Sequence, residues 1–145
     1  VSSVLYLGTV NYLGAFLLSL TIGRIGDKYS KTTAISFSML LFGSALSLFI
    51  VTGNLGFQVA AAFLRGASFP MWAYTGVIAG SMAPVAQRAR WISVVQTANR
   101  VSIIAAPYVG GVLYTHMPTT PFIFAIVVAL VLAALTSFRF LKKQS

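Results

Sequence analysis

Five long apolar stretches limit what this chain can fold into. Each is close to, or longer than, the roughly 20 residues that a helix needs to cross a lipid bilayer. Inside the bilayer, a helix satisfies its backbone N–H and C=O groups within one segment, without help from water. We therefore predict an all-α, polytopic membrane helix bundle with five transmembrane helices, covering about residues 4–23, 32–52, 55–82, 91–114 and 122–138.

The composition agrees with a lipid surrounding. Only 8% of the residues are charged and 58% are hydrophobic, and the mean hydropathy is +0.90. A soluble domain carries about 25% charged residues. The first stretch also lacks the basic beginning of a secretory signal peptide, so we count it as a transmembrane helix.

The basic residues lie almost entirely on one side of the predicted helices. They follow the first stretch, precede the fourth and follow the fifth, whereas the other two connections carry no Lys or Arg. The positive-inside rule places the basic side in the cytoplasm, so we expect a cell-membrane protein with its N-terminus outside and its C-terminus cytoplasmic. An odd number of helices that begins outside predicts part of a longer protein. The residues concerned are Arg24, Lys28, Lys31, Arg88, Arg90, Arg139, Lys142 and Lys143.

Several classes of function lack the residues that they need. The net charge is +9, but binding of nucleic acid needs a basic face on a soluble module, so we expect no nucleic-acid partner. The chain has no cysteine, and His116 and Asp27 are its single histidine and single acidic residue. No nucleophile–base pair or metal-ligand cluster can be assembled from them. We predict that the chain is not an enzyme and holds neither a metal nor a cofactor.

Two features of the stretches concern helix packing. Asn11, Ala15, Ser19 and Gly23 fall four residues apart on one face of the first helix. Small residues at this spacing allow membrane helices to approach closely. The third stretch contains Pro70, and we expect a bend there because proline removes a backbone hydrogen bond.

The segment from Gly23 to Thr32 resembles the signature loop of the major facilitator superfamily. Gly23, Asp27, Lys28 and Lys31 match the pattern, whereas a serine stands where glycine is usual and a threonine replaces the second basic residue. The resemblance implies a gating motif whose carboxylate helps to hold the two halves of a transporter together. A carboxylate facing the N-terminus of a helix is also favoured by the helix dipole. The alternative is an ordinary loop carboxylate within a basic patch.

The fourth stretch resembles a glycine-rich helix of antiporters in the same family. Small residues keep the register of that pattern, although three of its glycines are missing; the matching positions are Ser93, Ser102, Ala106, Pro107, Gly110 and Gly111. The resemblance implies a helix-packing motif at the last four positions. It further implies that the five helices are one half of a twelve-helix transporter, and we favour helices eight to twelve, with the other half missing from this chain.

Two arginines lie within the predicted spans. Arg65 and Arg100 are each about ten residues from a helix end, which is about 15 Å and near the bilayer midplane. An arginine at that depth usually faces a cavity or a partner. We predict that both line a substrate site, together with the polar residues Asn11, Tyr74 and Asn99. The alternative is that they reach the membrane surface or pair with an acidic residue of the missing half.

These observations lead to one expected function and one rival. The resemblance implies a secondary active transporter that moves a small solute across the cytoplasmic membrane by alternating access, in the form of an exporter of drugs or organic anions. Its partners would be membrane lipid, a small-molecule substrate and the missing half. The rival is a small five-helix membrane interaction subunit without transport activity.

Overall fold

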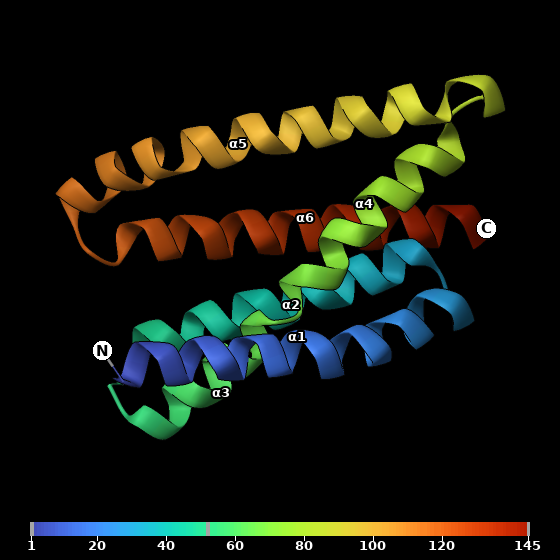
Figure 1. Ribbon diagram of the computed structural model, residues 1–145. Helices are drawn as coiled ribbons and strands as arrows, with labels where there is room; N and C mark the ends of the chain where they lie inside the picture. The colour runs from blue at the N-terminus through green and yellow to red at the C-terminus, as the bar shows by residue number, and fades with distance from the viewer. Residues whose placement is uncertain (1, 52, 145) are drawn as a thin grey trace. The chain divides into compact units, whose positions relative to one another are not determined.

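The computed structural model describes residues 2–51 and 53–144, and the regular structure in this part of the chain is helical. The predicted all-α fold is therefore confirmed. Figure 1 shows the helices in chain order: α1 Ser2–Lys28, α2 Lys31–Val51, α3 Leu55–Arg65, α4 Ser68–Met82, the short 3₁₀ helix η1 Val85–Gln87, α5 Arg88–His116 and α6 Thr120–Gln144.

The helices form two compact units. Unit 1 comprises Val1–Met71 together with Phe122–Ser145, and thus contains α1, α2, α3, the first turn of α4 and α6. Unit 2 comprises Trp72–Pro121 and contains the rest of α4, η1 and α5.

Unit 1 is built around the mutual packing of α1, α2 and α3, which lie side by side in Figure 1. Its covered side chains are mostly small, which keeps the helix axes close. Apart from one isoleucine on α1, the fully covered residues are alanines and a serine: Ile22, Ala34, Ser38, Ala45, Ala61 and Ala67. Because lipid provides no hydrophobic driving force between helices, the close packing that small side chains allow is what holds such helices together.

Hydroxyl groups within the helices are satisfied locally. The Ser38 hydroxyl donates to the Ala34 carbonyl at 2.8 Å, and the Ser47 hydroxyl donates to the Gly43 carbonyl at 3.0 Å. Such bonds to the preceding turn remove the cost of placing an unpaired hydroxyl in lipid. This is how serine and threonine are accommodated in helices that are otherwise apolar.

A close crossing of α1 and α3 depends on two glycines. A Cβ atom added at Gly14 would lie 2.8 Å from the Phe63 carbonyl carbon, and closer still to the carbonyl oxygen. A Cβ atom added at Gly66 would lie 2.7 Å from the Asn11 carbonyl oxygen and 2.6 Å from the Gly14 carbonyl carbon. Real Cβ atoms essentially never come within 3.0 Å of such atoms. The two backbones can therefore meet here only because both residues lack a side chain.

The third predicted span is interrupted beside this crossing, and not at Pro70. α3 ends at Arg65 and α4 begins at Ser68, so the break falls at Gly66 and Ala67. The Gly66 N–H donates to the Phe63 carbonyl and the Ala67 N–H to the Leu64 carbonyl, both at 3.0 Å. These bonds span three residues instead of the four of an α-helix.

The expected bend at Pro70 was wrong because of where this proline lies in its helix. Pro70 is the third residue of α4. In the first turn of a helix the N–H groups have no intrahelical partner, so proline is tolerated there. The ring of Phe69, in the same turn, packs against the ring of Tyr12 on α1, with 5.6 Å between the ring centroids. Both sides of the break are thus anchored to α1.

In unit 2, the C-terminal part of α4 approaches the N-terminal part of α5. A Cβ atom added at Gly80 would lie 3.2 Å from Ile92 Cδ1, and one added at Gly76 would lie 3.9 Å from Gln96 Nε2. The two glycines and their two neighbours are each spaced by four residues, so one face of α4 meets one face of α5 in antiparallel order. This packing fixes which face of α5 is turned toward α4.

Three helices in the described part of the chain are long and apolar enough to cross a membrane: Leu5–Lys28, Lys31–Val51 and Thr120–Ser137. They correspond to the first, second and fifth predicted spans. The third predicted span is divided into two shorter helices, and the fourth lies within α5, whose polar residues lower its hydropathy. The division of the chain into five transmembrane helices stays a prediction.

Candidate functional site

The segment proposed as a gating loop is mostly helical. α1 continues through Gly23 to Lys28, and α2 begins at Lys31, so only Tyr29 and Ser30 lie between the two helices. The predicted first span ended near Gly23, and the helix itself extends to Lys28. The side chains of Asp27 and Lys28 occupy the last turn of α1, and Lys31 occupies the first position of α2.

The single carboxylate is exposed at this end of unit 1. The side chains of Asp27, Lys28 and Lys31 are all exposed, and within the described part of the chain Asp27 forms no ion pair. The Lys28 ammonium lies 5.5 Å from the centroid of the Tyr29 ring, within the range of a cation–π contact. The first turn of α2 is capped by Ser30, whose hydroxyl oxygen accepts from the Thr33 N–H at 3.0 Å. Asp27 is thus left free to meet a partner that this part of the structure does not supply.

Arg65 lies at the C-terminal end of α3, next to the break. Its side chain is exposed, and it is the basic residue of the last turn of that helix. A cation at this position is stabilised by the helix dipole by about 0.3–1 kcal/mol. The presence of Arg65 here can therefore be explained without a substrate.

Asn11 meets the same break from α1. Its carbonyl oxygen faces Gly66, and its side-chain Oδ1 is covered without a hydrogen-bond partner among the described residues. The structure therefore brings two of the predicted site residues, Asn11 and Arg65, to one crossing.

Arg100 belongs to a polar stripe along α5. Successive residues of a helix are about 100° apart, so Ser93, Gln96, Thr97 and Arg100 share one face. The side chains of all four are exposed. Asn99 points away from this face and is half-buried, with its Nδ2 atom covered and without a described hydrogen-bond partner. The stripe groups Arg100 with hydroxyl and amide side chains, and not with its neighbour in the sequence.

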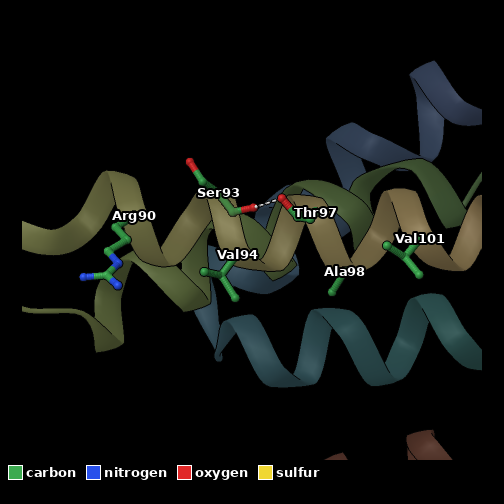
Figure 2. Close-up of a pocket in the computed structure, with 6 residues that line it drawn as sticks. All are labelled: Arg90, Ser93, Val94, Thr97, Ala98 and Val101. Atoms are coloured by element: carbon green, nitrogen blue, oxygen red, sulfur yellow. Dashed lines mark hydrogen bonds between the residues drawn. The ribbon is translucent and has the colours of Figure 1, made fainter.

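A shallow depression borders the stripe on the same helix. Figure 2 shows its lining: Arg90, Ser93, Val94, Thr97, Ala98 and Val101. The Thr97 hydroxyl donates to the Ser93 carbonyl at 2.9 Å, and the Ser93 hydroxyl donates to the Ala89 carbonyl at 2.8 Å. Both hydroxyl oxygens can still accept a hydrogen bond. This face of α5 therefore combines a cation, hydrogen-bond acceptors and apolar surface.

The remaining predicted site residues lie in unit 2. Tyr74 is half-buried on α4 and has an interaction partner. Pro107 lies inside α5 without ending it. A Cβ atom added at Gly110 or Gly111 would meet no described atom within 4 Å, and Ala106 beside them is exposed. The packing role of this motif stays a prediction.

Sequence reasoning missed two features of the site. The predicted stripe reaches the α1–α3 crossing at Asn11 and Ala15, whose backbone atoms face Gly66. It did not include Gly14 or Gly66, the two glycines that permit the close approach. Ser93 was assigned to the packing pattern, and Thr97 was not predicted. The signal for the polar stripe was present, because three- and four-residue spacing from Arg100 back to Ser93 can be counted in the sequence. The signal for the crossing was weak, since the positions of single glycines do not show which helix approaches them.

Comparison with known proteins bears on the identity of the fold. The model of the Major Facilitator Superfamily matches residues 1–145, the whole of the chain. No curated protein and no solved structure matches it. The match covers the α1–α2 motif, the broken α3–α4 segment and the polar stripe of α5. The chain therefore belongs to the major facilitator superfamily, as a multi-pass membrane protein and a transporter of the major facilitator type.

Proposed function

We propose that the chain is part of a secondary active transporter that moves a small anionic or strongly dipolar solute by alternating access. Arg100 and its polar stripe on α5 would face the translocation pathway. We further propose that the solute is exported and is an organic anion or a drug. The support for export is the resemblance of the small-residue motif at Ala106–Gly111 to an antiporter helix.

The observation that carries the proposal is the position of Arg100. It is the thirteenth residue of α5, which has 29 residues, and this places it about 18 Å from the start of the helix. An arginine near the middle of a membrane helix costs at least about 2.5 kcal/mol when it faces lipid. The adjacent Ser93, Gln96 and Thr97 would add to that cost. In a water-filled pathway the Arg100 guanidinium stays hydrated, so this cost does not arise. The cation can then attract an anionic solute.

Arg65 takes second place in this proposal. Its position at the C-terminus of α3 is stabilised by the helix dipole without any substrate. It lies beside the break at Gly66 and Ala67, and discontinuous membrane helices are common at substrate sites. We therefore keep Arg65, with Asn11 across the crossing and Tyr74 and Asn99 in unit 2, as candidate residues of the pathway that rank below Arg100.

Alternating access requires a second wall. The substrate site in such transporters lies near the midplane between structural repeats, and we propose that the other wall comes from a half outside this chain. In that arrangement the motif of Gly23, Asp27, Lys28 and Lys31 acts as a gate on the cytoplasmic side. The exposed carboxylate of Asp27, which has no ion-pair partner in the described part of unit 1, is available to pair across the gate.

The test is charge removal at Arg100 in the full transporter. Arg100→Gln should lower transport of organic anions by about tenfold or more, which corresponds to about 1.4 kcal/mol of lost binding. A panel of labelled organic anions and matched organic cations in proteoliposomes provides the assay. Arg88→Gln is the control, because it removes the same charge at the start of α5, where a cation has no lipid to avoid.

Two further outcomes are informative. Arg100→Lys keeps the charge but loses the planar set of donors, so it should retain part of the transport if attraction dominates. Normal anion transport by Arg100→Gln, at a normal level of folded protein, would contradict the assignment of Arg100 to the pathway.

A further inference from the structure

One end of unit 1 gathers basic residues from the end of one helix and the start of the next. Arg24 and Lys28 lie on the last turns of α1, and Lys31 is the first residue of α2. All three side chains are exposed. The connection between the helices is only two residues long, so the three cations are held at the same end of the unit.

A hydrogen bond brings the end of α6 to the same place. The hydroxyl groups of Ser36 on α2 and Thr136 on α6 lie 2.6 Å apart. Lys31 precedes Ser36 by five residues, or about 7.5 Å along the helix. α6 continues beyond Thr136 to Gln144 and carries Arg139, Lys142 and Lys143 in that extension. Figure 1 shows the C-terminal end of α6 and the α1–α2 connection at the same end of unit 1.

The depth of these residues in the membrane is set by the apolar spans. The apolar span in α1 ends at Lys28, and the span in α2 begins at Lys31. Arg24, Lys28 and Lys31 therefore lie where apolar side chains give way to polar ones, which is the depth of the lipid headgroups. Long basic side chains at such positions extend toward the phosphate groups.

The charges are not neutralised within the unit. Asp27 is the single acidic residue of the whole chain. The N-terminus of α2 adds the positive end of a helix dipole at the same place. Basic residues beside membrane helices attract anionic lipid, at about 1 kcal/mol for each residue near the surface.

We propose that this surface binds the phosphate of an anionic phospholipid. We name it the basic end of unit 1, and it consists of Arg24, Lys28 and Lys31. Its depth favours a headgroup held in the bilayer over a dissolved anion, which would be free to bind at any exposed cation. The bound lipid would lie at the α1–α2 connection, at the end of unit 1 to which the hydrogen bond between Ser36 and Thr136 ties α6.

The experiment measures lipid selectivity of the full transporter. The purified protein is reconstituted in phosphatidylcholine that contains a trace of spin-labelled phosphatidylglycerol or spin-labelled phosphatidylcholine. The fraction of motionally restricted label gives the relative association of the two lipids. The double variant Lys28→Gln/Lys31→Gln should lower the preference for phosphatidylglycerol by about fivefold for each lysine that attracts the lipid. Asp27→Asn should raise the preference, because it removes the one opposing charge.

A matched double variant separates this surface from total charge. Arg88→Gln/Arg90→Gln removes two charges from unit 2 and should lower the preference much less. Equal losses in the two double variants would show attraction by total charge and overturn the proposal. If free glycerol phosphate abolishes the preference of the unchanged protein, the surface binds dissolved phosphate and the proposal is wrong. If the unchanged protein shows no preference for phosphatidylglycerol, the proposal is also wrong. Lys28→Arg/Lys31→Arg, which keeps the charge, should preserve the preference.

Discussion

Replacement of Gly14 by alanine tests the close crossing of α1 and α3. The added Cβ atom would lie 2.8 Å from the Phe63 carbonyl carbon and 2.9 Å from the Phe63 Cα atom. Both are backbone atoms, which cannot rotate away as the end of a flexible side chain can. α1 and α3 would have to separate, and the small covered side chains around the crossing would no longer pack against each other.

The magnitude follows from comparison with Gly8, on the same helix. A Cβ atom added at Gly8 would meet nothing within 4 Å. Both replacements gain the same preference of alanine for the helix, about 1 kcal/mol, so the difference between the two variants isolates the crossing. Forcing an extra methyl group into a well-packed interface costs about 1–3 kcal/mol. We expect Gly14→Ala to be less stable than Gly8→Ala by about that amount.

The assay is unfolding of the full transporter in mixed micelles, with helix content followed as denaturing detergent is added. Gly66→Ala should behave like Gly14→Ala, because its Cβ atom would meet Asn11 and Gly14 backbone atoms. The double variant should lose less than the sum of the two single losses, since one separation of the helices relieves both clashes. Equal unfolding free energies for Gly14→Ala and Gly8→Ala would refute this account of the crossing.

Three further predictions concern the gate, the orientation and the position of α6. Asp27→Asn should leave the amount of folded protein unchanged but slow transport, because the proposed gate loses its only carboxylate; normal transport rates would return Asp27 to an ordinary surface role. A cysteine introduced at Gly53 should react with an impermeant thiol reagent from outside intact cells, whereas one at Ser30 should not, and equal labelling would contradict the proposed orientation. The hydrogen bond between Ser36 and Thr136 can be removed by Ser36→Ala, by Thr136→Val or by both changes together. A double-mutant cycle of these variants should give a coupling energy of about 0.6 kcal/mol. A coupling energy of zero would mean that this bond does not hold α6.

The helical fold and the family follow from local properties of the sequence. Runs of apolar residues near membrane length predict helices, because backbone groups in lipid must be satisfied within each segment. The motif around Asp27 indicated the major facilitator superfamily, and the match over residues 1–145 confirmed it. The register that unites Arg100 with Ser93 and Thr97 can also be counted along the chain, since it depends only on the helical period.

The position of the helix break depended on tertiary packing. Proline predicts a break by its own chemistry, but Pro70 falls in a first turn that tolerates it. The helix is instead interrupted at Gly66, where α1 passes so close that no side chain fits. At the same crossing Gly14 lies beside Asn11 and Ala15 of the predicted stripe, although the stripe did not include Gly14. The positions of the break and of the crossing could not be predicted from the sequence of one helix, because the space available to a residue is set by the backbone of another helix.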